Sequence, residues 1–177
     1  MKNGDVITLD ATANLDRMMQ RQAGKRVTLA IEGRQPVYVQ PITMTAEKDL
    51  RYAQWVEERR AFVTKWSGGK LGYVHIKDMG SDSLTKLELD LDAEAQSKQG
   101  VVVDIRNNNG GFVNGYALDI FNRRNYMNMQ QRDGPNVSAR AALGQRAISK
   151  PTVLLINQHT LSDGEDFTEG YRALGLG

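Results

Sequence analysis

Cysteine is absent from the sequence and histidine is scarce, with His75 and His159 as the only imidazoles in 177 residues. The lack of cysteine excludes disulfides, thiol catalysis and thiolate metal sites, and it leaves the cytoplasm and the periplasm both open as compartments. Two histidines are too few for a histidine-rich metal site. We therefore expect neither a metal nor another cofactor.

Charge clusters and long apolar runs are also missing. The net charge is only +2, and the arginine pairs at 59–60 and 123–124 are isolated. Because nucleic-acid and polybasic membrane surfaces need clustered Lys and Arg, we expect no nucleic-acid partner. No apolar stretch approaches the ~20 residues of a transmembrane helix, and residues 1–5 lack the apolar core of a signal peptide. We expect no membrane segment in this chain.

Residues 1–43 have the pattern of short strands with one short helix. We expect strands at 5–9, 27–31 and 37–41, and a helix at 15–22 that ends before the turn at Gly24. A unit of this kind has little core of its own.

Helical periodicity replaces the strand pattern from residue 47 to residue 66. The apolar residues that share one face of this expected helix are Tyr52, Trp55, Val56, Phe62, Val63 and Trp66. Arg59 interrupts the face, and we expect it to lie along the rim of a core with its guanidinium in water. Ser67-Gly-Gly69 is expected to end the helix.

Three strand-then-helix units follow, and such alternation predicts an α/β fold with a parallel sheet. The expected strands are 71–76, 101–105 and 153–156, and the expected helices are 81–98, 113–123 and 162–173. Continuous apolar runs at 101–105 and 153–156 predict that both strands are central and covered on both faces. An apolar stripe on the first helix is expected to pack in the core; it consists of Leu84, Leu87, Leu91 and Ala95.

A polar, glycine-containing loop follows the strand at 101–105. Residues 104–111 read Asp-Ile-Arg-Asn-Asn-Asn-Gly-Gly and lead into a helix. Glycines let backbone N–H groups approach a ligand, and a helix N-terminus favours negative charge, so the loop could form an oxyanion hole or a phosphate cradle. It could equally be a tight strand-to-helix turn. Because it matches neither the dinucleotide fingerprint nor the P-loop, nucleotide binding is disfavoured.

The loop after the third strand places Ser162 where a strand passes into a helix. Hydrolases often place a nucleophile at such a junction, beside backbone N–H groups and the positive helix end. Ser162-x-x-Glu165 is also a capping box, which would merely start a helix. Asp163 and Glu165 are interpreted as ordinary acidic stabilisers of the first helical turn.

Both loops are expected at the carboxyl edge of the sheet, where open α/β sheets bind ligands, and together they suggest acyl transfer. A catalytic base is not evident. His75 lies within a strand and is expected to be packed or hydrogen-bonded, and His159 is too close to Ser162 in the chain for a direct hydrogen bond to be favoured. Residues 125–148 show little periodicity and are expected to form a substrate-contacting flap over the site.

These loops resemble the paired motifs of the serine peptidases that include the C-terminal processing peptidases and tricorn protease. The resemblance lies in Asp104-Ile-Arg-Asn-Asn-Asn-Gly-Gly111 and in Thr160-Leu-Ser-Asp-Gly-Glu165. Further segments resemble the tricorn branch more specifically: Trp55-Val56, Arg59, residues 67–76 and Asp78-Met79. Residues 4–42 are similar to the latter part of the PDZ domain that precedes the catalytic core in that branch.

The resemblance implies a crotonase-like α/β core of parallel strands and flanking helices, with a partial PDZ-like, β-rich segment at 1–43, a connecting helix at 44–69 and the N-terminal part of the peptidase core at 70–177. It assigns Ser162 as the nucleophile. The oxyanion hole would be formed by the N–H of Asp163 and one from the Gly110-Gly111 turn, with Asn109 where the family often has glycine. Peptide or unfolded-protein substrates and a homo-oligomeric full-length protein are also implied.

The resemblance further implies that the base lies outside this sequence. In tricorn-like enzymes a histidine comes from a segment before the PDZ domain, and in processing peptidases a lysine follows the nucleophile. We therefore expect a fragment of a longer enzyme that is catalytically silent alone. The alternatives are a non-catalytic peptide- or ligand-binding protein on the same scaffold, and an esterase or amidase with the same site.

Overall fold

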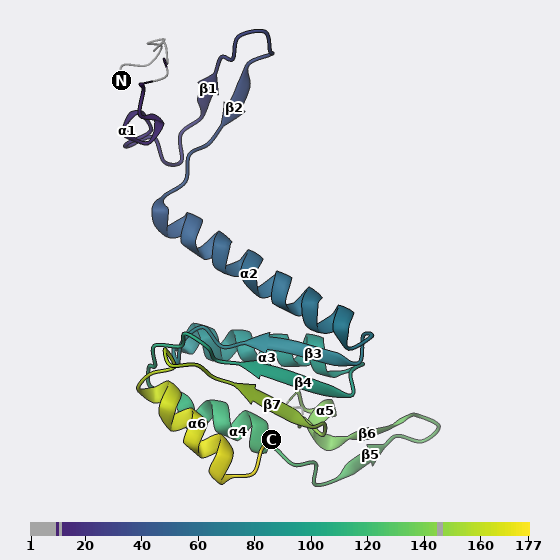
Figure 1. The fold of residues 1–177 in the computed structure, drawn as a ribbon. Coiled ribbons are helices and arrows are strands. Elements are labelled where there is room, and N and C mark those ends of the chain that lie inside the picture. The colour runs from purple at the N-terminus through teal and green to yellow at the C-terminus, as the bar shows by residue number, and fades with distance from the viewer. Residues whose placement is uncertain (1–9, 11, 145–146) are drawn as a thin grey trace. The chain divides into compact units, whose positions relative to one another are not determined.

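The computed structural model describes residues 10, 12–144 and 147–177, and the chain divides into two units, Met1–Gln54 and Trp55–Gly177. Figure 1 shows the order of the elements along the chain. The strand expected at 5–9 lies outside the described residues. Within the described ranges, no helix is both long and apolar enough to cross a membrane.

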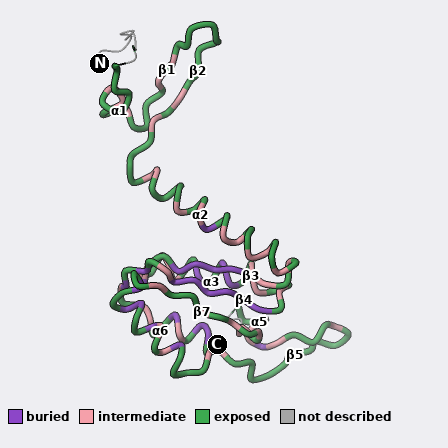
Figure 2. The backbone as a smooth tube through the Cα atoms, viewed as in Figure 1, coloured by how far each residue is buried: buried purple, intermediate pink, exposed green. Residues whose placement is uncertain are grey.

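The first unit contains a short helix and a β-hairpin. Its elements are α1 (Leu15–Met18), β1 (Val27–Leu29) and β2 (Val37–Val39), and the two strands pair antiparallel. All three are shorter than expected; the helix ends at Met18, and Arg21 beyond it has a φ of 61°. None of the described residues up to 54 is buried, in keeping with the small core expected for this unit (Figure 2).

Helix α2 (Met44–Trp66) crosses the boundary between the units. It starts three residues earlier than expected, where the Thr43 side chain accepts a hydrogen bond from Ala46 N–H at 3.1 Å. Val56 is the one residue of α2 that is buried, whereas Phe62 and Trp66 are 57% and 74% exposed. Tyr52, Trp55 and Val63 on the same face are half-buried.

The second unit is built on a three-stranded parallel sheet, as expected. Its strands are β3 (Leu71–His75), β4 (Gly100–Asp104) and β7 (Thr152–Leu155), in the order β3-β4-β7. Every residue of the central strand β4 is buried. The expectation that 153–156 is also central is wrong: β7 is at the edge of the described sheet, and Val153 and Leu155 are exposed on one face. An apolar run predicts a strand but does not fix its place in the sheet.

Three helices pack on one face of this sheet: α3 (Ser81–Ala95), α4 (Asn114–Asn122) and α6 (Asp163–Ala173). Side chains at alternate sheet positions, such as Val74, Val101 and Val103, form a single core with all three helices. The predicted stripe on α3 belongs to this core, directly or at its margin, through Leu84, Leu87, Leu91 and Ala95. The core thus holds α6, whose first turn carries Ser162 as N-cap, against the sheet.

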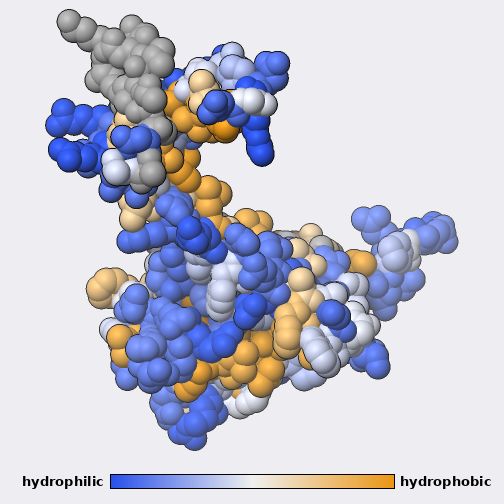
Figure 3. Space-filling view, turned by 45° about the horizontal axis from the view of Figure 1, so that its top comes forward, coloured by the Kyte–Doolittle hydropathy of each residue, from blue (hydrophilic) through white to orange (hydrophobic). Residues whose placement is uncertain are grey.

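The segment between α4 and β7 is more regular than expected. It contains the antiparallel pair β5 (Asn128–Gln130) and β6 (Asn136–Ser138), followed by α5 (Ala139–Ala142). The hairpin extends away from the sheet in Figure 1, and Figure 3 shows its outer part as hydrophilic.

Candidate active site

The loops that follow β4 and β7 lie against each other at the carboxyl end of the sheet. Asn107 and Asn157 form a reciprocal pair: the Asn107 N–H donates to the Asn157 Oδ1, and the Asn157 Nδ2 donates to the Asn107 Oδ1, both at 3.0 Å. The Thr160 hydroxyl donates to the Ile105 carbonyl at 3.0 Å. The expectation that these two loops share one edge of the sheet is confirmed.

Ser162 is the N-cap residue of α6 and is exposed. Its φ of 54° and ψ of −126° are unfavourable for a residue with a Cβ, so the chain turns sharply at this position. The predicted capping box is present, and the Glu165 carboxylate accepts a hydrogen bond from the Ser162 N–H at 2.6 Å. Capping and exposure of a hydroxyl at a strained strand-to-helix turn therefore coexist in one residue.

Asp163 follows Ser162 and turns its side chain into the protein. The buried carboxylate accepts hydrogen bonds from the Asn114 N–H, at 3.0 Å, and from the Asn114 side-chain amide. It thereby caps α4, whose own N-cap residue, Val113, makes no side-chain cap bond. The acidic group is a stabiliser, as expected, but of the neighbouring helix. Its backbone N–H donates to none of the described residues.

The glycine turn packs directly on the turn that carries Ser162. A Cβ added to Gly110 would lie 2.8 Å from the Ser162 Cβ and 3.0 Å from the Asp163 nitrogen. Gly110, Ser162 and Asp163, three of the residues predicted for the site, are thus in contact. Only a residue without a side chain permits this approach.

The two glycines of the turn use their N–H groups differently. Gly110 donates to the Asn108 Oδ1 at 2.8 Å, and its carbonyl accepts from the Met79 N–H at 2.9 Å. Gly111 forms a parallel bridge with Met79, in which the Phe112 N–H donates to the Met79 carbonyl. In such a bridge the middle residue directs its own N–H to the opposite side, here the side of β7 and Ser162. The Gly111 N–H donates to none of the described residues.

Neither histidine side chain hydrogen-bonds to Ser162. His75 is buried, its Nε2 lies 3.1 Å from the Arg106 carbonyl oxygen, and its ring meets the Trp55 ring edge-on at 4.9 Å. Burial lowers its pKa despite that hydrogen bond. His75 is therefore a packed, hydrogen-bonded histidine, as expected. His159 is exposed, and among the described residues no histidine or lysine side chain hydrogen-bonds to Ser162.

An ion pair between a buried carboxylate and a half-buried arginine supports the start of the glycine loop. Asp104 is fully buried at the end of β4, where it accepts hydrogen bonds from the Tyr73 hydroxyl at 2.8 Å and from the Arg106 side chain at 2.5–3.0 Å. Burial would raise the pKa of Asp104, but the hydrogen bonds from Arg106 and Tyr73 outweigh it and the pKa is lowered. Sequence reasoning missed this pair; the signal available was an acidic residue at the end of an otherwise apolar strand.

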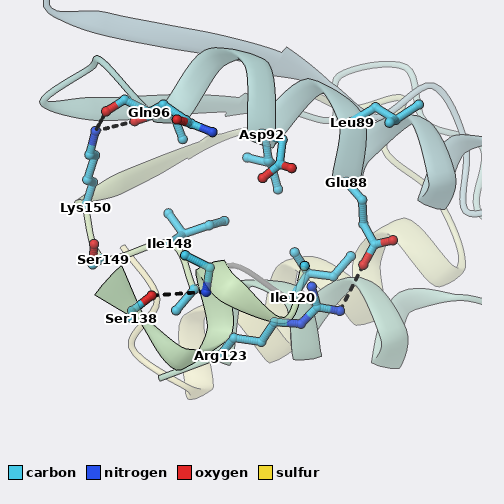
Figure 4. A pocket seen from close by; sticks show the side chains of 15 residues that line it. Glu88, Leu89, Asp92, Gln96, Ile120, Arg123, Ser138, Ile148, Ser149 and Lys150 are labelled. Carbon is cyan, nitrogen blue, oxygen red and sulfur yellow. Dashed lines mark hydrogen bonds and ion pairs between the residues drawn. The ribbon is translucent and has the colours of Figure 1, made fainter. Parts of the chain in front are cut away.

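The segment expected to cover the site lies elsewhere. The Lys150 ammonium donates to the Gln96 carbonyl at 2.7 Å, and residues within 138–144 and 147–150 border a cavity of about 490 Å³ together with α3 and the end of α4. Figure 4 shows Arg123 paired with Glu88 on one side of this cavity. The C-terminal ends of α3 and α4 lie at the edge of the sheet opposite Ser162. The prediction that this segment forms a flap over the site is therefore wrong within this chain. The described residues include no cluster of three or more His, Asp or Glu that could hold a metal.

Comparison with known proteins adds the following similarities. Residues 70–177 match the model of peptidase family S41. The chain is 33% identical over 158 residues to tricorn protease homolog 1 of Streptomyces coelicolor, which covers 88% of this chain and 14% of that protein. It is 30% identical over 174 residues to the tricorn protease of Thermoplasma acidophilum, covering 96% of this chain and 16% of that protein.

A crystal structure of tricorn protease has a similar fold, with a TM-score of 0.73 and 28% identity over 91% of this chain and 15% of that one. The chain therefore spans less than a fifth of the length of the proteins it resembles. The shared fold is an α/β arrangement with a parallel sheet and helices.

Proposed function

The chain belongs to peptidase family S41 and is similar to tricorn proteases, and on that premise we propose that Ser162 is the nucleophile of a serine peptidase. The observation that carries the proposal is the packing of Gly110 on Ser162 and Asp163, because it places a glycine turn beside an exposed, strained serine. Either loop alone would be an ordinary turn.

The Gly111 and Asp163 N–H groups are proposed to form the oxyanion hole. Both lack an acceptor among the described residues, whereas the Gly110 N–H is used by Asn108. The Asp163 N–H also lies in the first turn of α6, where the helix dipole favours negative charge. Aligned backbone N–H donors of this kind stabilise the charge that develops on a carbonyl oxygen in acyl transfer.

The proposed reaction proceeds through an acyl-enzyme. The Ser162 Oγ attacks the carbonyl carbon of a peptide bond while its proton passes to a general base, and the carbonyl oxygen becomes an oxyanion. Collapse of this intermediate breaks the C–N bond, and the amine leaves with the proton. Water then attacks the ester by the same route and releases the acid and the free serine.

We propose that the general base reaches Ser162 from outside the described residues, so that the chain alone is catalytically silent. In support, no described histidine or lysine side chain hydrogen-bonds to Ser162, and His75 is fixed at the Arg106 carbonyl. The tricorn relatives are several times longer than this chain and have room for a further segment at the site.

The domain layout is proposed on the same similarity. Residues 70–177 would form the N-terminal part of a crotonase-like peptidase core, residues 44–69 a connecting helix, and residues 1–43 part of a PDZ-like segment. The antiparallel β1–β2 pair and the parallel β3-β4-β7 sheet are compatible with this layout. Peptides or unfolded proteins are the proposed substrates of a homo-oligomeric full-length protein.

Peptide hydrolysis by the full-length protein and by this chain alone tests the proposal. We expect cleavage of a fluorogenic peptide by the full-length protein, its loss in Ser162→Ala, and no cleavage by the chain alone. Ser149→Ala, which removes an exposed hydroxyl at the opposite edge of the sheet, is the matched control and should retain activity. Binding of the peptide without cleavage would favour a binding protein instead.

A further inference from the structure

Asn108 differs from the two asparagines beside it. Asn107 and Asn109 are exposed, whereas Asn108 has no exposed surface. A buried amide is costly unless its donor and acceptor are both satisfied. The Asn108 Nδ2 donates to the Ile76 carbonyl at 3.0 Å, and its Oδ1 accepts from the Gly110 N–H at 2.8 Å.

The backbone of Asn108 makes a third connection. Its carbonyl oxygen accepts a hydrogen bond from the Leu161 N–H at 2.9 Å, immediately before Ser162 in the chain. Asn108 therefore joins the segment after β3, the glycine turn and the loop that carries the nucleophile. It also packs closely on α6, since a Cβ on Gly164 would lie 3.3 Å from the Asn108 Oδ1.

We propose that Asn108 is a positioning residue for the oxyanion hole. By accepting the Gly110 N–H, its side chain leaves the Gly111 N–H as the donor on the Ser162 side. By accepting the Leu161 N–H, its backbone holds the turn that presents the Asp163 N–H at a fixed distance from the first donor. This inference rests on the proposed function of Ser162, but it concerns the alignment of the two donors and not the identity of the nucleophile.

The reason for such a residue is that oxyanion stabilisation depends on donors that are already aligned. Removing one donor costs about 10²- to 10³-fold in kcat, and a misplacement of about 1 Å can cost about 10²-fold. A loop with two glycines does not hold this geometry by itself. A buried amide with hydrogen bonds to both neighbouring segments restricts it.

A comparison of substrate and oxyanion-mimic affinities tests this role in the full-length protein. The probes are a fluorogenic peptide amide, which gives KM, and a peptide boronic acid of the same sequence, which gives Ki. Both constants are independent of the fraction of active enzyme, so a variant that is merely less stable leaves them unchanged. The variants are Asn108→Ala and Asn108→Asp, with Asn109→Ala as the exposed control in the same loop.

In Asn108→Ala we expect Ki for the boronate to rise about 10- to 100-fold while KM changes less than about twofold, because only the oxyanion mimic occupies the hole. Asn108→Asp keeps the acceptor for the Gly110 N–H and should show a smaller rise in Ki. It replaces the alanine variant in the comparison if that variant does not fold. Asn109→Ala should match the wild type.

Two contrary results are distinguishable. An active wild type whose Asn108 variants keep the ratio of Ki to KM would overturn the positioning role alone. A wild-type protein that neither cleaves the peptide nor binds the boronate would overturn the proposed function, and this inference with it.

Discussion

The two ends of the parallel sheet are built differently. At the carboxyl end, hydrogen bonds from buried or paired amide side chains join the segments after β3, β4 and β7, as with Asn108 to Ile76 and Asn107 to Asn157. At the amino end, the helix termini and residues within 138–144 and 147–150 border an open cavity of about 490 Å³, and the Lys150 ammonium donates to the Gln96 carbonyl at the end of α3.

The carboxyl end of the sheet has a fixed geometry, whereas the amino end is loosely packed. Buried amides add little net stability but allow only one arrangement of the loops they join, because each unpaired group would be costly. An open cavity imposes no such restriction. The carboxyl end is therefore the part of the molecule suited to hold reacting groups in place, and the predictions below test this contrast with changes at either end of the sheet.

The largest effect is expected from Gly111→Ala. A Cβ at this position would lie 2.0 Å from the Met79 carbonyl oxygen, a backbone atom that cannot move aside without breaking the bridge. We expect a loss of more than about 3 kcal/mol in the free energy of unfolding, measured by urea denaturation. Gly115→Ala in α4 is the control, since a Cβ there meets nothing within 4 Å, and it should be neutral or slightly stabilising. Equal losses in the free energy of unfolding for Gly111→Ala and Gly115→Ala would contradict the prediction.

Arg106→Leu should have the next largest effect. It leaves the Asp104 carboxylate fully buried with Tyr73 as its remaining side-chain partner, at a cost of about 3 kcal/mol in the free energy of unfolding. The control is Arg172→Leu, which breaks the exposed, solvent-screened pair with Glu169 and should change the free energy of unfolding far less. Thermal or urea unfolding of both variants measures the contrast, and an Arg106 variant no less stable than the Arg172 variant contradicts it.

Lys150→Met tests the amino end directly. The ammonium donates to the Ala95 and Gln96 carbonyls at the end of α3, and its removal should cost about 1 kcal/mol in the free energy of unfolding. Because this edge is distant from Ser162, peptide cleavage by the full-length protein should be unchanged. A loss of cleavage larger than the loss of folded protein would show that the two ends of the sheet are coupled.

The smallest effect concerns pH. Burial lowers the pKa of His75 below its ordinary value of 6.5, so the folded protein binds fewer protons than the unfolded chain in the range just below 6.5. The stabilising contribution of the neutral His75 should therefore be fully present above pH 6.5. The free energy of unfolding should fall as the pH decreases through this range. Urea denaturation above and below pH 6.5 should show a smaller fall in His75→Gln than in the wild type. A wild-type protein that becomes more stable as the pH falls through this range would contradict the prediction.

Much of the second unit was predictable from periodicity. The helices at 81–95 and 163–173 and the strands at 100–104 and 152–155 follow from apolar spacing, since each element buries one stripe or run. The edge position of β7 was not predictable, because an apolar run does not encode the order of strands in a sheet. The hairpin at 128–138 was mistaken for an irregular flap, although Asp133-Gly134 is a turn signal between two short strands.

The candidate site was predictable only where the chemistry is local. Ser162 and the two glycines follow from a strand, a loop and a helix start that are contiguous in sequence. Asn108 could not be distinguished from Asn107 and Asn109, because three consecutive amides look alike until tertiary contacts bury one of them. The choice of Gly111 over Gly110 as a donor likewise depends on Met79, which is remote in sequence.

The account depends most on the identity of the nucleophile, and the most direct measurement is to map the adduct of a fluorophosphonate probe on the full-length protein by mass spectrometry. We predict a single covalent adduct on Ser162 that is absent from Ser162→Ala. An adduct on a different serine, or a peptidase whose cleavage is abolished by the probe while Ser162 stays unmodified, would contradict the account.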